Sequence, residues 1–396
     1  MSPELSAAAA FAIAAVATYL ATPVAIRVAV RTGFFDLPAG YKGHRQPTPY
    51  LGGTAIIVGI LAAVFSVRGF SASHWTIVVA AVAIWAMGTA DDRLNLPISV
   101  RTLAEAGIAV LFYATGRGWD VFGFGPADLA LTIVWVVGVM NAFNLMDNMD
   151  GASATTAAVS AAGAGALALI SGDTYLAPLG FAVAGACFGF LPRNLARPAR
   201  IFMGDGGSLL LGLLVARVTM AAVTRSYLGP SGVVVAALLV GIVIFDTTLV
   251  TVSRSRAGVN VLSGGRDHLT HRLARWLGTP RRVAMALALV QLAVCGMTIG
   301  VAQAGIGWVL LTGGMMVAAG VALIWQFERS MMFGRDAPAR SAGAPHAPGA
   351  LPSPSGALAA PPAPPWPEPA AGGTELAPGN LTLAVTRAES PTDSRP

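Results

Sequence analysis

The chain has 396 residues, of which 55% are hydrophobic and only 11% are charged. Because roughly a quarter of the residues in an average soluble domain are charged, this composition excludes a soluble globular protein. The net charge of +6 does not indicate a nucleic-acid partner, since the 25 basic residues are scattered between apolar runs. The sequence therefore predicts an all-α polytopic membrane protein.

Long apolar runs follow one another along the chain. A hydrocarbon core of about 30 Å needs about 20 apolar residues for each helical crossing. The first run is too long for the apolar core of a signal peptide, so we expect it to be a span. The sequence predicts about eleven transmembrane helices, over residues 7–30, 51–67, 76–90, 102–115, 129–140, 153–170, 175–191, 208–223, 232–252, 283–302 and 306–325.

Positive charge is distributed unevenly between the two sets of loops. Sixteen Lys and Arg residues fall in alternate loops, over residues 27–50, 91–101, 142–151, 191–207 and 252–282. The loops between them carry only Arg68, Arg117 and Arg225. Because basic loops stay in the cytoplasm, we expect the N-terminus outside and the C-terminus inside the cell.

The composition changes near the end of the chain. Residues 336–396 contain 14 of the 26 prolines and are rich in Ala, Gly and Ser. Such a segment buries too little apolar surface to offset the entropy lost on ordering. We therefore expect a transmembrane domain over residues 1–335 and a disordered cytoplasmic tail over residues 336–396.

Acidic residues gather in three of the predicted cytoplasmic loops. The clusters contain Asp91 and Asp92; Asn144, Asp147 and Asp150; and Asp205. Carboxylate and amide oxygens suit Mg²⁺ or Mn²⁺, whereas zinc would call for a His and Cys cluster. A kink near Gly151 would bring the middle cluster together, and free amides at Gly206 and Gly207 would bind a phosphate.

The last cytoplasmic loop is basic. It contains Arg266, His268, His271 and Arg272, and we expect these groups to contact phosphates. Arginines alone would also be explained by membrane topology. Asp246, inside the ninth predicted span, is either a functional carboxylate or a polar anchor between helices.

The motifs resemble those of the polyprenyl-phosphate N-acetylhexosamine-1-phosphate transferase family, or glycosyltransferase family 4. The resemblance covers residues 33–278 and rests on several motifs in the family's order: GFFDLPAGYKGHRQPTPYLGG, ADD, NAFNLMDNMDG, NLARPARIFMGDGGS and DHLTHR. The resemblance implies about ten or eleven transmembrane helices with an active site on the cytoplasmic face of a bacterial inner membrane.

The implied reaction joins the sugar phosphate of a UDP-N-acetylhexosamine to a polyprenyl phosphate and releases UMP, with Mg²⁺ or Mn²⁺. It would be the first membrane step in the synthesis of a cell-envelope polysaccharide or glycoconjugate. The partners that we expect are the two substrates and the lipid bilayer. The sequence points to no other protein as a partner, and a homodimer is possible.

The resemblance also assigns roles by position. Asp205 is similar to the family's metal ligand, with Asn144 as a second contributor, and Asp91 to the residue that orients or deprotonates the lipid phosphate. The remaining matches are the catalytic-pocket acids Asp92, Asp147 and Asp150, and the substrate-binding residues Lys42, His44, Asn194, Arg266, His268, His271 and Arg272.

Three positions depart from the family's pattern. Thr270 replaces the middle His of the HxHH motif, Asn148 stands where many members have Gly, and Arg101 stands where Lys is frequent. The HLTHR form resembles the UDP-N-acetylglucosamine branch more than the phospho-N-acetylmuramoyl-pentapeptide branch, which remains the alternative. A prenyltransferase should show NDxxDxxxD-like motifs, which are absent, and a sugar or lipid transporter should carry its polar residues near the bilayer midplane.

Overall fold

The computed structural model describes residues 1–37, 46–68, 72–173, 176–224, 228–261 and 265–333. They belong to one compact unit over Met1–Pro338. Lys42 and His44 lie outside the described residues, as does the predicted tail over residues 336–396.

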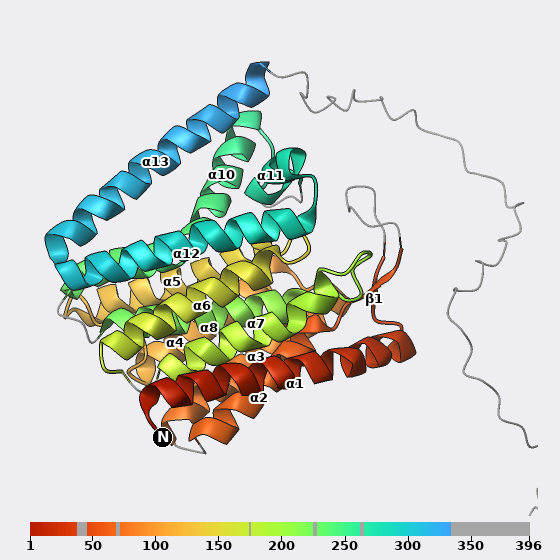
Figure 1. The fold of residues 1–396 in the computed structure, drawn as a ribbon. Coiled ribbons are helices and arrows are strands. Elements are labelled where there is room, and N and C mark those ends of the chain that lie inside the picture. Colours follow the sequence, from red (N-terminus) through yellow and green to blue (C-terminus); the bar gives the residue numbers. More distant parts are fainter. Residues whose placement is uncertain (38–45, 69–71, 174–175, 225–227, 262–264, 334–396) are drawn as a thin grey trace, which may run out of the picture. The chain divides into compact units, whose positions relative to one another are not determined.

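Helices make up nearly all of the described chain, and a two-residue antiparallel strand pair precedes the second helix. In chain order the elements are α1 (Pro3–Thr32), β1 (Phe35–Asp36), β2 (Thr48–Pro49), α2 (Gly52–Arg68), α3 (Ala72–Leu94), α4 (Ile98–Ala114), α5 (Gly125–Met146), α6 (Ala152–Ile170), α7 (Ala177–Asn194), α8 (Asp205–Thr224), the 3₁₀ turn η1 (Gly229–Ser231), α9 (Gly232–Leu239), α10 (Gly241–Ala257), α11 (Leu269–Leu277), α12 (Pro280–Ala304) and α13 (Ile306–Phe333). Figure 1 shows α1 and α2 on one side of the bundle and α12 and α13 on the other.

The helices confirm a polytopic membrane protein. All eleven predicted spans fall largely on helices. Within the described residues, six helices are long and apolar enough to cross a membrane, or seven if the bent pair α9 and α10 is one span. The others are shorter or more polar: α2 and α4 have 17 residues each, and α3 carries Asp91, Asp92 and Arg93 near its end. The count of eleven spans therefore stays a prediction.

The ninth predicted span is not one straight helix. The chain breaks at Val240, and the axes of α9 and α10 differ by 77°. Gln291 of α12 lies at this break, where its amide accepts from Ile242 N and donates to Leu239 O. The backbone groups freed by the break thus find a partner within the protein, as a non-aqueous surrounding requires.

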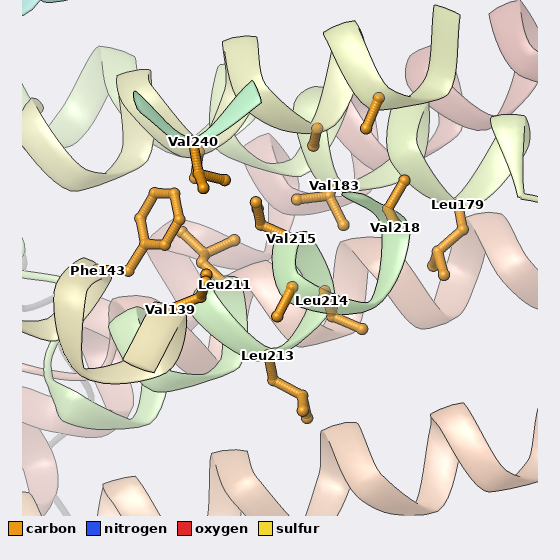
Figure 2. Packing of buried hydrophobic residues seen from close by; sticks show 14 of the residues in the cluster. Val139, Phe143, Leu179, Val183, Leu211, Leu213, Leu214, Val215, Val218 and Val240 are labelled. Atoms are coloured by element: carbon orange, nitrogen blue, oxygen red, sulfur yellow. The ribbon is translucent and has the colours of Figure 1, made fainter. Parts of the chain in front are cut away.

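Helix α8 lies at the centre of the bundle. Its apolar segment is 94% buried, whereas that of α13 is 17% buried. Figure 2 shows the packing around it, in which Leu211, Leu214, Val215 and Val218 lie among Val139 and Phe143 of α5, Leu179 and Val183 of α7, and Val240. The neighbours of α8 therefore separate it from lipid along most of its length.

Close backbone contacts join the helices. Gly185 and Gly189, four residues apart on α7, face the carbonyl oxygens of Phe11 and Ala15 on α1, where a Cβ atom would clash. Contact through small residues is the usual way in which helices pack in a membrane, where apolar burial gives no driving force.

The same kind of contact fixes the start of α8. A Cβ atom on Gly53 would collide with the backbone of Gly206 and Gly207. Three main-chain hydrogen bonds, from Gly52 N to Phe202 O, Gly53 N to Met203 O and Phe202 N to Pro49 O, tie the two segments together. The start of α8 is thus held by the start of α2.

The substitution Gly53→Ala should therefore destabilise the protein by about 1–3 kcal/mol, because the added methyl group meets backbone that cannot move aside. Thermal unfolding of the purified protein in detergent measures the effect. Gly107→Ala in α4 is the matched control, since a Cβ atom there meets nothing within 4 Å. Equal unfolding temperatures for the two variants would contradict the packing argument.

Candidate active site

Asp92, in the last turn of α3, caps the first turn of α8. Its Oδ1 accepts from Asp205 N at 2.8 Å and its Oδ2 from Gly206 N at 3.3 Å. The next two amides of α8, of Gly207 and Ser208, bond to Gly204 O. A carboxylate at a helix N-terminus is stabilised by the helix dipole. The expectation that free amides here bind a phosphate is therefore wrong, because Asp92 and Gly204 occupy them.

Arg101, near the start of α4, joins the acidic clusters. Its Nη1 lies 2.7 Å from Asp91 Oδ2 and 3.1 Å from Asp205 Oδ2. Its Nη2 donates to Asn144 Oδ1 at 3.2 Å. One guanidinium thus binds α3, α5 and α8 through charge-assisted hydrogen bonds, which are about twice as strong as neutral ones.

Asn144, in the last turn of α5, orients Asp205. Its Nδ2 donates to Asp205 Oδ1 at 2.8 Å and to Ser208 Oγ at 3.0 Å. Both oxygens of Asp205 therefore have partners, one in Asn144 and one in Arg101. This arrangement presents the carboxylate of Asp205 in one defined direction.

The predicted kink near Gly151 is confirmed. Helix α5 ends at Met146, and the chain turns through residues 147–151 with Gly151 in the left-handed conformation at φ 79°. Within the described residues the Asp147 carboxylate makes no hydrogen bond. Loss of hydration, and then the charges of Asp205, Asp92 and Asp150, raises the pKa of Asp147. The four carboxylates therefore share one region with an excess of negative charge.

Tyr50 lies beside these acids, just before α2. Burial, and then the charges of Asp92, Asp205 and Asp147, raises the pKa of the Tyr50 phenol, so the hydroxyl stays protonated. It is a hydrogen-bonding partner of Asp92. Tyr50 is missing from the predicted site residues. Its position in the sequence, between PTP and the double glycine, could have indicated that it belongs to the site.

Asn194, predicted to bind the nucleotide, is buried and engaged with the backbone. Its Oδ1 accepts from Gly151 N at 2.7 Å and its Nδ2 donates to Ile201 O at 3.0 Å. These bonds tie the turn after α5 to the segment that leads into α8. Asn194 therefore joins the turn that contains Asp147 to the segment that precedes Asp205.

The histidine motif is attached to α10. His268 Nδ1 lies 2.8 Å from Asp246 Oδ2, and Asp246 Oδ1 accepts from Leu269 N at 2.6 Å. The Asp246 carboxylate thus fixes the His268 ring and caps α11 at the same time. Of the two readings of Asp246, the structure shows an anchor, and the side chain that it anchors is a predicted site residue.

Arg272 of α11 is turned into the protein. Its Nη2 donates to Ser253 Oγ at 2.6 Å and to Glu328 Oε1 at 3.3 Å, and Nε donates to Asp267 O. Arg266 is exposed. The predicted phosphate-binding set is therefore divided, because Arg272 packs between helices while Arg266 faces outward.

A direct hydrogen bond connects the acidic loop with the histidine motif. Thr270 Oγ1 donates to Asn148 Oδ1, and Asn148 Nδ2 donates to Leu145 O at 2.6 Å. Thr270 also contacts His271, with 3.3 Å between Oγ1 and Nδ1. Two loops separated by more than a hundred residues are thereby joined.

The structure brings Asp91, Asn144 and Asp205 together around Arg101, and Asp92 bonds to the backbone at the start of α8. The charges of Asp92, Asp150 and Asp205 act on Asp147, so these acids share one region. Arg101 is also missing from the predicted site residues. The sequence indicated the position only as one where Lys is frequent in the family. Within the described residues, no three His, Cys, Asp or Glu side chains already form a metal-binding group. The donors are nevertheless all oxygen atoms, and in the part of the chain that the structure describes the Asp147 carboxylate accepts no hydrogen bond, so the donor chemistry fits Mg²⁺ or Mn²⁺.

Comparison with known proteins bears on the reaction. Residues 74–223, from α3 to α8, match the model of glycosyl transferase family 4. A probable undecaprenyl-phosphate N-acetylglucosaminyl 1-phosphate transferase of Bacillus subtilis is 30% identical over 71% of this chain and 81% of its own. A decaprenyl-phosphate N-acetylglucosaminephosphotransferase of Mycolicibacterium smegmatis is 33% identical over 70% and 77%. An undecaprenyl-phosphate alpha-N-acetylglucosaminyl 1-phosphate transferase of Escherichia coli is 28% identical over 72% and 82%. These matches show that the chain belongs to glycosyl transferase family 4.

Proposed function

We propose that this protein transfers N-acetylglucosamine-1-phosphate from its UDP derivative to a polyprenyl phosphate in the membrane and releases UMP. The relatives named above carry out transfers of this kind on undecaprenyl or decaprenyl phosphate, by their names. The alternative donor is UDP-N-acetylmuramoyl-pentapeptide, and the alternative from another class is a transporter for a sugar or lipid.

The observation that carries this proposal is the convergence on Arg101. Asp91, Asn144 and Asp205 come from three sequence motifs, and each lies within 3.2 Å of the Arg101 guanidinium. These groups lie at the ends of α3, α5 and α8 and near the start of α4 rather than in mid-helix. A transporter would instead place its polar groups near the bilayer midplane.

The chemistry needs charge control more than a strong base. A phosphate monoester has a second pKa near 6, so the lipid phosphate is mostly a dianion at neutral pH. Its oxygen attacks the sugar-linked phosphorus, a new P–O bond forms, and the bond to the UMP phosphate breaks. The obstacle is the repulsion between this dianion and the pyrophosphate of the donor.

Side chains held in fixed positions reduce the repulsion between the lipid phosphate and the pyrophosphate of the donor. Arg101 supplies a fixed positive charge between Asp91 and Asp205, and it needs little reorganisation when charge develops nearby. Asp91, bonded to Arg101 and to Leu96 N, orients the lipid phosphate through the Arg101 guanidinium that it holds in place. Tyr50 and Asp92 hold the start of α8 in place, which keeps Asp205 directed at the reacting phosphates.

The proposal includes a bound Mg²⁺ or Mn²⁺ ion. Asp205 would hold it, with Asp147 and the Asn144 amide oxygen as further donors. The charge that develops on the departing UMP phosphate is stabilised when such a cation is bound. The excess of carboxylates around Asp147 is the support for this assignment.

The proposal includes the location of the protein. Eleven spans with the N-terminus outside and the C-terminus inside would place the acidic cluster on the cytoplasmic face of a bacterial inner membrane, where UDP-sugars are made. The excess of Lys and Arg in the loops of that face supports this orientation.

UMP release by the purified full-length protein tests the function. With undecaprenyl phosphate and Mg²⁺, UDP-N-acetylglucosamine should give UMP and UDP-N-acetylmuramoyl-pentapeptide should not. UMP from the pentapeptide donor alone would reverse the choice of substrate. UMP from neither donor, together with uptake of unmodified sugar into vesicles, would favour the transporter.

Asp205→Asn should abolish turnover while the protein still inserts and folds, because the variant keeps the size of the side chain but loses the charge. Binding of Mn²⁺, measured by electron paramagnetic resonance, should weaken in parallel. Asp120→Asn is the matched control, since Asp120 is exposed and lies between α4 and α5, at the opposite ends of these helices from Arg101 and Asn144. Normal turnover in Asp205→Asn would remove the metal assignment.

Arg101→Ala should lower kcat/KM by about 100-fold or more, because the buried Asp91 and the partly buried Asp205 lose their shared partner. Arg101→Lys should lose less, since an ammonium keeps the charge but cannot bond in a plane to three groups. Arg117→Ala is the control, because the Arg117 guanidinium bonds to the nearby Thr115 carbonyl. Equal losses in the Ala and Lys variants would show that charge at this position is unimportant.

A further inference from the structure

Two residues that depart from the family's pattern contact each other. Asn148 stands in the acidic loop and Thr270 in the first turn of α11, and the Thr270 hydroxyl donates to the Asn148 amide oxygen. Thr270 is fully buried, and its oxygen also lies 3.3 Å from His271 Nδ1. The two departures therefore act on the same histidine.

The directions of these hydrogen bonds can be assigned by following the donors. Asn148 Nδ2 lies 2.6 Å from Leu145 O, which can only accept. The amide oxygen of Asn148 therefore faces Thr270, because the flipped amide would set two acceptors against each other. The single hydroxyl proton of Thr270 is thus used on Asn148.

The consequence falls on His271. Since the Thr270 hydroxyl has no second proton, its oxygen can only accept from the imidazole. His271 must then carry a proton on Nδ1. Within the described residues His271 Nε2 has no partner, so in the neutral ring this nitrogen presents a lone pair.

The surroundings of His271 favour the neutral ring. Partial burial, and then the nearby His268 and Arg266, lowers the pKa of His271 to about 4, while Asp246 and Asp267 oppose the shift. His271 also lies in the first turn of α11, where the helix dipole disfavours a cation. The bidentate pair between Arg254 and Asp267 leaves little of the Asp267 charge to act on the ring.

We propose that Asn148 and Thr270 are positioning residues that hold His271 in the Nδ1-protonated form, so that Nε2 accepts a hydrogen bond from a hydroxyl or amide N–H of the sugar nucleotide. A phosphate, which has only acceptor oxygens at neutral pH, is not the partner of this nitrogen. The identity of the ligand rests on the proposed function, whereas the state of the imidazole does not. This proposal differs from the expectation that His271 contacts a phosphate.

Nitrogen-15 NMR of histidine-labelled protein measures the imidazole directly. The chain has five histidines, so His271→Gln assigns the relevant signals by their loss. At pH 7 the His271 ring should be neutral and protonated on Nδ1. Protonation on Nε2 alone, or on both nitrogens, would overturn the proposal whether or not the protein releases UMP.

Thr270→Val keeps the shape of the side chain and removes its hydrogen bonds. The Nδ1-protonated form should then lose its preference, and KM for the UDP-sugar should rise several-fold while kcat changes less. Thr248→Val in α10 is the matched control, because the Thr248 hydroxyl is exposed and, among the described residues, bonds only to Ile244 O of its own helix. An unchanged His271 spectrum in Thr270→Val would show that Thr270 does not set the tautomer.

A double-mutant cycle tests the link to Asn148. Thr270→His restores the family's histidine but needs the space that the Asn148 side chain fills, and Asn148→Gly provides that space. The double variant should therefore retain at least about fivefold more kcat/KM than independent effects predict. Additive losses in a folded double variant would contradict the coupling between the two positions.

Discussion

The two hydrogen bonds from the start of α8 to the Asp92 carboxylate are the constraint on which the site depends. They fix the position of Asp205, because the amides of Asp205 and Gly206 are the groups that Asp92 accepts from. Gly204, with φ 76°, leaves room for that carboxylate, where a Cβ atom would collide with it. Every other contact of Asp205 follows from this placement.

A single cationic side chain, Arg101, lies among the carboxylates at the centre of the site. Arg101 binds Asp91 and Asp205, while Asp92 is balanced by backbone dipoles and a tyrosine hydroxyl rather than by a second base. Asp147 has neither kind of partner among the described residues. One positive charge thus serves two carboxylates, and an excess of negative charge remains around Asp147, as a site for a cation requires.

Sequence motifs predicted which loops meet but not how their side chains pair. The order of the acidic motifs, the end of α5 and the helical character of the spans followed from composition, periodicity and resemblance. The capping role of Asp92 did not, since its partner lies 113 residues away. The backbone bonds of Asn194, the inward turn of Arg272 and the bend between α9 and α10 depend equally on tertiary contacts, which no local pattern encodes.

The burial of α8 has a consequence for how the protein is assembled. A helix that is surrounded by its neighbours must enter the membrane through lipid before those neighbours enclose it, so its apolar side chains serve first its insertion and later its packing. Helices α3, α4 and α5, which carry the side chains bonded to Asp205, precede α8 in the chain and are therefore synthesised before it. An incomplete chain that ends before α8 therefore contains most of the acidic residues of the site but lacks Asp205, around which they are arranged.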